Sequence, residues 1–349
     1  MLPRHHRSPA TFRHLTKLVV AGALLGGAVA CAADDSPDTA TPTTAAAPTT
    51  TAPTTPPDAA TTTTTTTTIT TTTGGSTGPV DLCADRTDPV ALGRLADPSL
   101  DEVSGAALSR AHPGTIWLIE DSGNPPVITA VDETGTTVTS VTLEVDATDW
   151  EDLALAPGPD GTPHLFVADI GDNAAARTTV AVLRVPEPDP AAGDQTLAPD
   201  RIELVLPSGA ADAEALLVDP ERGDLVVVTK DPFGVGQVLV APGAARDDPG
   251  GPITMDAAGE VELGLLGAVL AGDASPQAGA IALRTPSTVW LWAWDDDATI
   301  GEALSDEEPC RAPSVTDLFG EALALDDAGG YVLAGEGVGS TLWRVGGVG

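Results

Sequence analysis

The segment Glu151-Asp-Leu-Ala-Leu-Ala-Pro157 is the clearest copy of a pattern that returns along the chain, an acidic residue followed by small and apolar residues. The other copies begin and continue in the same way: Glu102–Ser109 (EVSGAALS), Glu214–Pro220 (EALLVDP), Glu321–Asp326 (EALALD) and, more weakly, Asp273–Leu283 (DASPQAGAIAL). Successive copies start 49, 63, 59 and 48 residues apart. Self-similarity at such a period is typical of repeat architectures in which each repeat is one supersecondary unit.

Runs of β-branched, aromatic and apolar residues follow these copies, and clusters of turn residues separate the runs. Examples are Thr115–Glu120 (TIWLIE), Asp224–Lys230 (DLVVVTK) and Val289–Trp294 (VWLWAW). Small residues after the acid fit the innermost strand of a four-stranded blade, because blades crowd together around a common axis. We therefore predict an all-β fold, a β-propeller of five blades over 81–349, with six blades as the alternative. Pro89–Leu95 is expected to supply the outer strand that closes the last blade, and Leu265–Leu270 is expected to form a short helix.

The first 30 residues have the layout of a signal peptide. A basic stretch from Arg4 to Lys17 precedes an apolar run, Leu18–Ala30, that is too short to span a membrane. The junction Ala28-Val-Ala-Cys31 resembles a bacterial lipobox, in which the cysteine is acylated and becomes the first residue of the mature protein. We therefore predict a signal peptide over 1–30 and lipidation of Cys31. The alternative is ordinary cleavage after an A-x-A motif, which releases a soluble protein.

The next segment, 31–80, is composed mostly of Thr, Pro and Ala, and it includes the unbroken threonine run Thr61–Thr68. Such a composition cannot bury enough apolar surface to offset the entropy of ordering the chain. We predict a disordered, lipid-anchored linker that holds the folded domain away from the outer face of the cell membrane. The protein is secreted instead if Cys31 is not lipidated. Stalks of this composition are often O-glycosylated, and the sequence leaves that modification open.

The charge of the chain is strongly negative, with 51 Asp and Glu residues against 16 Lys and Arg residues and a formal net charge of −35. Nucleic acid is therefore not expected as a partner, because clustered Lys and Arg are needed to bind phosphate backbones. The chain has no G-x-S-x-G motif, and the histidines that follow the signal peptide, His112 and His164, lie in proline-flanked segments that are expected to form turns. A serine triad and a histidine-based zinc site are therefore disfavoured.

Two cysteines, Cys83 and Cys310, remain when Cys31 is assigned to lipid. An even pair in an oxidising compartment predicts a disulfide, with two buried free thiols as the alternative. Such a bond would tie the start of the folded domain to the last part of the chain, which suits a closed ring.

Several motifs carry a resemblance to a known family. They are E-x-S-G from Glu102, I-W-x-x-x-D-S-G from Ile116, D-W-E-D-L-A from Asp149, and A-D-I-G-D-N from Ala168, which Arg177 and Glu187-Pro188 follow. In this order they resemble a family of exported bacterial β-propellers, described as WD-repeat-like and without an assigned activity. The chain departs from that pattern at Ile119-Glu120, where a His-Asn pair is common. The resemblance spans 100–345 and implies the propeller fold.

The acids that start the repeats are the candidate metal ligands, because inner strands that begin at one end of a propeller bring their first residues together. They are Glu102, Glu151, Glu214, Asp273 and Glu321. Several carboxylates at close range need a cation or a shared proton, and a site of oxygens without imidazole suits Ca²⁺. The alternative is that each acid caps its own strand through backbone N–H groups.

A second group of residues is predicted to bind an anionic part of a ligand. Lys230 is the only lysine after the signal peptide, and it ends a β run beside the predicted acidic ring. Arg284 and Arg177 supply further cations, and Asp172 and Asn173 belong to the neighbouring A-D-I-G-D-N loop. Such a group binds phosphate or carboxylate. Ion pairs between neighbouring blades are the alternative.

Two functions remain open on this evidence. The first is a monomeric binding or interaction module on the cell surface, with a calcium site at the mouth of the propeller and a small molecule, glycan or protein as its ligand. The second is a calcium-dependent hydrolase of phosphate esters or glycans. Membrane contact is expected through the lipid anchor only.

Overall fold

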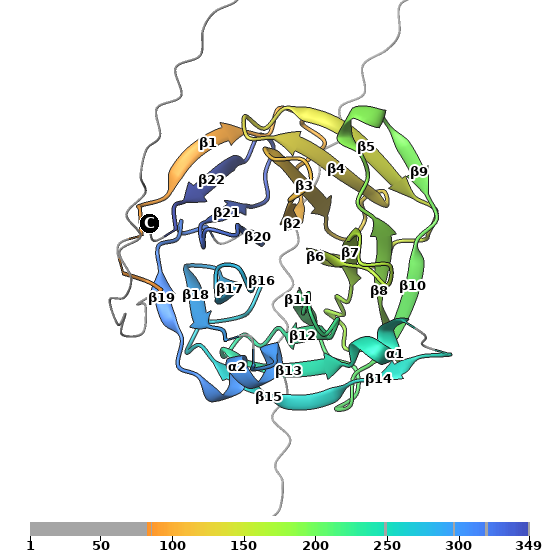
Figure 1. The fold of residues 1–349 in the computed structure, drawn as a ribbon, viewed down its shortest axis with the longest axis vertical. Coiled ribbons are helices and arrows are strands. Elements are labelled where there is room, and N and C mark those ends of the chain that lie inside the picture. The colour runs from red at the N-terminus through yellow and green to blue at the C-terminus, as the bar shows by residue number, and fades with distance from the viewer. Residues whose placement is uncertain (1–81, 85, 248–249, 296, 318–319, 348–349) are drawn as a thin grey trace, which may run out of the picture. The chain divides into compact units, whose positions relative to one another are not determined.

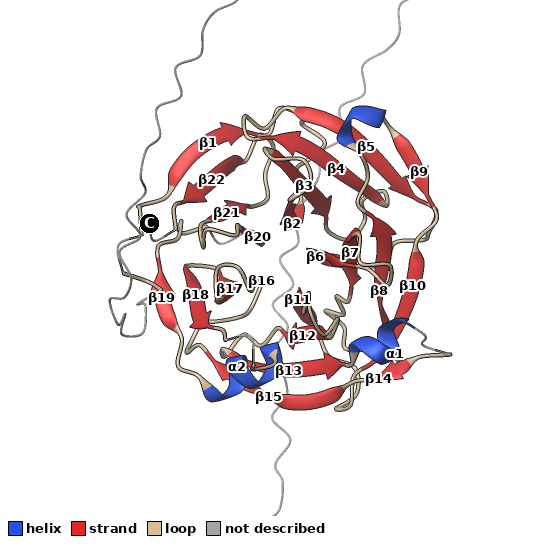
Figure 2. Cartoon of the chain, viewed as in Figure 1, coloured by secondary structure: helices blue, strands red, loops and turns tan. Residues whose placement is uncertain are grey.

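The computed structural model describes residues 82–347 except 85, 248–249, 296 and 318–319. The predicted signal peptide, Cys31 and the predicted linker lie outside the described residues. Strands are the main secondary structure of the described chain, and they form five sheets around a common axis (Figures 1 and 2). The prediction of a five-bladed β-propeller is therefore confirmed. No helix within the described ranges has the length and apolar character needed to cross a bilayer.

Blades 1 and 2 each contain five strands. In order from the axis outward, blade 1 contains β2 (Val103–Leu108), β3 (Thr115–Glu120), β4 (Val127–Asp132), β5 (Thr137–Leu143) and β9 (Gln195–Leu197). Blade 2 contains β6 (Trp150–Pro157), β7 (Pro163–Asp169), β8 (Val180–Pro186), β10 (Asp200–Val205) and β14 (Ile253–Thr254). The outermost strands β9 and β14 pair in parallel with their neighbours. Strand β9 lies in the connection between β8 and β10 of blade 2 but pairs with blade 1, and β14 lies between β13 and β15 of blade 3 but pairs with blade 2.

Blades 3, 4 and 5 each contain four antiparallel strands. Blade 3 contains β11 (Ala213–Val218), β12 (Leu225–Thr229), β13 (Val235–Ala241) and β15 (Asp256–Glu262). Blade 4 contains β16 (Ala271–Ser275), β17 (Ala280–Thr285), β18 (Thr288–Ala293) and β19 (Cys310–Ala312). Blade 5 contains β20 (Ala322–Leu325), β21 (Tyr331–Ala334), β22 (Thr341–Val345) and β1 (Val90–Arg94).

Two contacts close the ring between the start and the end of the described chain. Strand β1 pairs antiparallel with β22, so the predicted closing strand at Pro89–Leu95 is confirmed as Val90–Arg94. The predicted disulfide between Cys83 and Cys310 is also confirmed, and it joins the segment before β1 to β19 of blade 4.

Small residues on the inner strands allow neighbouring blades to approach closely. Gly105 of β2 shows the requirement, because a Cβ atom there would lie 2.7 Å from the backbone nitrogen of Leu153 in β6. Side chains alternate between the two faces of each blade. In β11, Leu216 packs in the core shared with blade 2, whereas Leu217 packs in the core shared with blade 4.

Two carboxylates join the inner strands of different blades. Asp152 of β6 is fully buried, and its Oδ2 accepts hydrogen bonds from the backbone N–H groups of Leu216, at 2.9 Å, and Gly272, at 3.0 Å. Asp273 of β16 accepts from Ala274 N through Oδ1 and from Leu325 N through Oδ2, each at 2.8 Å. These bonds connect blade 2 to blades 3 and 4, and blade 4 to blade 5.

Within the described residues, the helices lie elsewhere than at the predicted position, Leu265–Leu270. They are the 3₁₀ turn η1 (Pro190–Ala192), α1 (Gly243–Asp247) and α2 (Ile300–Asp306). The prediction of a helix at Leu265–Leu270 is wrong, because these residues form the connection between β15 and β16. A tight turn occupies its start, where Gly267 N donates to Gly264 O at 2.9 Å. A Cβ atom on Gly267 would lie only 2.7 Å from that same oxygen.

Candidate metal centre at the mouth of the propeller

Two glutamates occupy irregularities at the start of their inner strands. In β6, Trp150 pairs with Asp169 and Asp152 pairs with Ala168, so Glu151 is an extra residue between the two pairs. In β11, Glu214 occupies the equivalent position between Ala213 and Ala215. A β-bulge of this kind leaves one residue unpaired and redirects its side chain.

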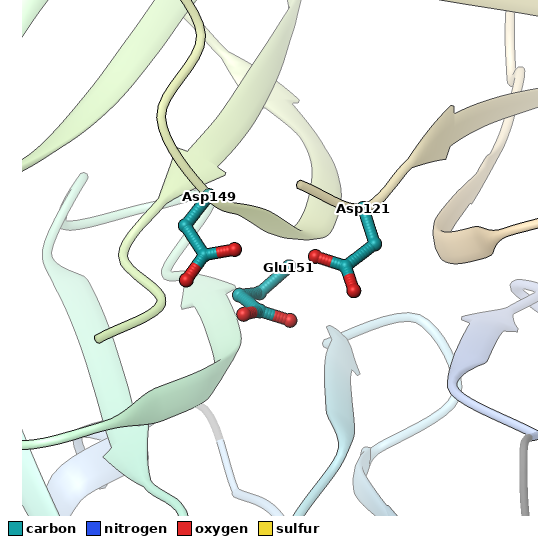
Figure 3. A group of neighbouring side chains, drawn as sticks. All are labelled: Asp121, Asp149 and Glu151. Carbon is teal, nitrogen blue, oxygen red and sulfur yellow. The ribbon is translucent and has the colours of Figure 1, made fainter. Parts of the chain in front are cut away.

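Glu151 is a member of a first group of three carboxylates, with Asp121 and Asp149. One oxygen from each lies within 4.8 Å of the others. Asp121 follows β3, Asp149 directly precedes β6, and the three side chains point toward one another (Figure 3). Two segments, one from each of two neighbouring blades, therefore bring these oxygens together.

Glu151 also belongs to a second group, with Asp212 and Glu214, whose oxygens lie within the same 4.8 Å limit. Asp212 precedes β11, and its Oδ1 accepts a hydrogen bond of 2.8 Å from Asp172 N. We call the five carboxylates of the two groups the acidic mouth: Asp121, Asp149, Glu151, Asp212 and Glu214.

The carboxylates of the acidic mouth are poorly satisfied by the protein. Glu151 is 4% exposed and Glu214 is 3% exposed. Oε1 of Glu214 forms an ion pair with Lys230 Nζ, but its Oε2 is buried and accepts no hydrogen bond. Asp149 Oδ1 is likewise buried without a partner, and no described residue forms a hydrogen bond or ion pair with the Glu151 carboxylate. Buried charged oxygens without partners are costly, so this arrangement favours a bound cation.

The pKa values of these groups are raised in agreement with their burial. Desolvation, with the added repulsion of Glu214, raises the pKa of Glu151 to about 10. Desolvation also raises the pKa of Glu214 to about 8, against the opposing attraction of Lys230. The pKa of Asp149 rises to about 6 because of its burial and the charge of Asp121. Without a cation, the acidic mouth therefore retains protons at neutral pH, and a divalent ion would displace them.

The other predicted metal ligands occupy three different settings. Glu321 lies near the acidic mouth, and desolvation raises its pKa to about 7. Glu102 is exposed, and its Oε2 accepts a hydrogen bond of 2.7 Å from Asn124. Asp273 accepts a backbone hydrogen bond from its own strand through Oδ1 and from β20 through Oδ2, as the strand-capping alternative expects. The structure therefore brings Glu151 and Glu214 together, with Glu321 nearby.

Among the predicted cations, Lys230 contacts the acidic mouth and Arg284 does not. The Lys230 ammonium pairs with Glu214, and although desolvation lowers its pKa, the attraction of Glu214 outweighs this and raises it. Arg284 is 1% exposed and donates to the backbone oxygens of Ala322, at 2.6 Å, and Ala334. Burial lowers the pKa of Arg284 to about 10. Arg284 therefore joins blades 4 and 5, whereas Lys230 forms an ion pair with a member of the acidic mouth.

Arg177, Asp172 and Asn173 belong to a loop of blade 2 that is bonded mainly to itself. The Arg177 guanidinium donates to Gly171 O at 2.7 Å and pairs with Asp169 at 2.8 Å. The Asp172 carboxylate accepts from the backbone N–H of Arg177 at 2.8 Å, and Asn173 is exposed. Because Asp172 N also donates to Asp212, this loop positions a member of the acidic mouth.

Sequence reasoning missed three members of the acidic mouth: Asp121, Asp149 and Asp212. A readable signal was present for two of them, because Asp149 and Asp212 each stand two residues before a repeat glutamate, in D-x-E. Asp121 belongs to the D-S-G turn after β3, and only the arrangement of the blades places it beside Glu151.

No protein-family model matches the sequence, and no curated protein matches it. Among solved structures, the chain is similar to the structure of U3-55K, at 14% sequence identity over 70% of this chain and 67% of that chain, with a TM-score of 0.37. It is also similar to a chain of the crystal structure of the mitotic checkpoint complex, at 14% identity over 67% of this chain and 59% of that chain, with a TM-score of 0.34. The function is therefore inferred from the geometry of the acidic mouth.

Proposed function

We propose that this protein is a ligand-binding module whose acidic mouth holds a divalent cation, with Ca²⁺ as the ion. The observation that carries the proposal is the buried Oε2 of Glu214, which accepts no hydrogen bond while it lies among other carboxylates. Ca²⁺ takes several oxygen ligands in flexible geometry, and the acidic mouth offers only oxygens.

The ligand of this module is proposed to be an anionic group, such as phosphate or carboxylate, on a small molecule, glycan or protein. A bound Ca²⁺ and the Lys230 ammonium would stand close together, and both attract anions. Hydrolysis of a phosphate ester or glycan at this site would need Lys230 and Arg284 to face the same cavity as the acidic mouth. Arg284 is instead bonded to backbone oxygens, so the geometry supports binding over hydrolysis.

The first prediction is that calcium stabilises the protein. At a calcium concentration about one hundred times the dissociation constant, binding to the folded state adds about 2.7 kcal/mol to the free energy of unfolding. For a domain of this size we expect the melting temperature to rise by about 6 °C. The double variant Glu151→Gln/Glu214→Gln should lose this rise, because neutral amides remove two carboxylates from the acidic mouth.

Thermal unfolding followed by circular dichroism, in calcium and in chelator, measures the effect. Glu144→Gln is the matched control, because Glu144 is an exposed glutamate after β5 that lies outside the acidic mouth. It should keep the full rise. Equal melting temperatures for the wild type in calcium and in chelator would reject the cation site.

We also propose that the propeller is exported and anchored to the outer face of the membrane through Cys31, as a monomer. The lipobox-like sequence supports the anchor, and the Cys83–Cys310 disulfide supports an oxidising compartment. Cys31→Ser should move most of the protein from the membrane fraction to the medium, as measured by fractionation and immunoblotting. Retention of the variant at the membrane would contradict the lipid anchor.

A further inference from the structure

The two groups of the acidic mouth are separate sets that share one member. Asp121 and Asp149 belong only to the first group, and Asp212 and Glu214 belong only to the second. Glu151 belongs to both, and a carboxylate has two oxygens, so it can give one to each of two ions. The mouth therefore offers three carboxylates to each of two positions.

Each group also contains its own buried oxygen without a partner. In the first group this atom is Asp149 Oδ1, and in the second it is Glu214 Oε2. The shared residue, Glu151, is more than nine-tenths buried and its carboxylate has no partner among the described residues. One ion placed in either group would leave the unpartnered oxygen of the other group unsatisfied.

The charges of the acidic mouth point to the same number of ions. Its five ionised carboxylates carry a formal charge of −5, and Lys230 contributes +1. One divalent cation leaves −2, which two retained protons would neutralise, whereas two divalent cations displace the protons and bring the sum to zero. Glu321 and Glu336 stand nearby and add further negative charge when they are ionised.

We infer that the acidic mouth binds two divalent cations, one held by Asp121, Asp149 and Glu151 and the other by Glu151, Asp212 and Glu214. This inference rests on the proposed function and adds the number and position of the ions. The second position is the weaker one, because the Lys230 ammonium is paired with Glu214 and repels an ion placed beside it.

Isothermal titration of the full chain with calcium tests the inference. The wild type and Glu144→Gln should bind two ions in unequal steps, whereas Asp121→Asn and Asp212→Asn should each bind one. Glu151→Gln should weaken both steps by at least about tenfold. Lys230→Met should tighten the weaker step by about tenfold and leave the stronger step nearly unchanged.

A second measurement does not depend on any variant. Two Mn²⁺ ions that share a carboxylate are exchange-coupled, so the electron paramagnetic resonance spectrum of the Mn²⁺-loaded wild type should differ from that of an isolated ion. A single calcium per chain with an isolated-ion spectrum would overturn the two-ion inference and leave the proposed cation site standing. Loss of all binding in Asp121→Asn and in Asp212→Asn, with both variants folded, would also overturn it. No calcium binding by the wild type would contradict the proposed function itself.

Discussion

In chelator, the free energy of unfolding should fall by about 4 kcal/mol as the pH rises from about 5.5 to about 7.5. The cause is the acidic mouth, where burial raises the pKa of Glu151 to about 10 and that of Glu214 to about 8. The unfolded chain releases both protons near the ordinary glutamate pKa of 4.5, whereas the folded protein keeps them. Stability is therefore lost as the pH rises, by up to about 1.4 kcal/mol per pH unit for each retained proton.

Urea unfolding across this pH range measures the slope. Saturating calcium should flatten it, because the ion takes the place of the retained protons. The double variant Glu151→Gln/Glu214→Gln should also have a flatter slope in chelator, and near neutral pH it should be more stable than the wild type. The same steep slope in the wild type and the double variant would show that the two glutamates are not its source.

Removal of the disulfide should lower the free energy of unfolding by about 5 kcal/mol, because the bond closes a loop of 227 residues in the unfolded chain. The variant is Cys83→Ala/Cys310→Ala. The bond also holds the segment before β1, where the Arg86 guanidinium donates to Gly329 O and lies 5.6 Å from the Tyr331 ring centre. Loss of the bond therefore loosens the closure of the ring between blades 4 and 5.

Urea unfolding with and without reductant measures this effect. Reductant should lower the wild-type midpoint toward that of the double alanine variant, and it should leave the variant unchanged. A wild-type midpoint that is insensitive to reductant, with complete reduction shown by thiol labelling, would contradict the expected contribution.

The number of blades was predictable from the sequence because each blade repeats the same physical requirement. An inner strand needs small residues where blades meet, and segments of small residues that follow an acid recur along the chain, as Gly105 shows in β2. The parallel outer strands β9 and β14 were not predictable, because each pairs with a blade formed earlier in the sequence. The start of helix α2 is marked in the sequence by the capping box of Thr299 and Glu302. The β-type runs on either side of this segment favoured a strand interpretation instead.

The candidate site was predictable only in part. The repeat spacing placed Glu151 and Glu214 at one end of the axis, but it gave no sign of the bulges in which they lie. Asp273 begins a repeat in the same way, yet its regular pairing leaves its carboxylate on backbone N–H groups. Arg284 has the charge of an anion-binding residue, and only its burial shows that it joins two blades.

Diffraction from crystals of the protein grown in calcium tests the central claim most directly. We predict electron density for a cation whose oxygen ligands lie about 2.3–2.6 Å away and include the carboxylates of Asp121, Asp149 and Glu151. Glu214 Oε2, which has no hydrogen-bond partner, should become a ligand of a cation at the neighbouring position. An acidic mouth that holds only water at millimolar calcium, with Glu151 bonded to protein groups or to that water, would contradict the claim.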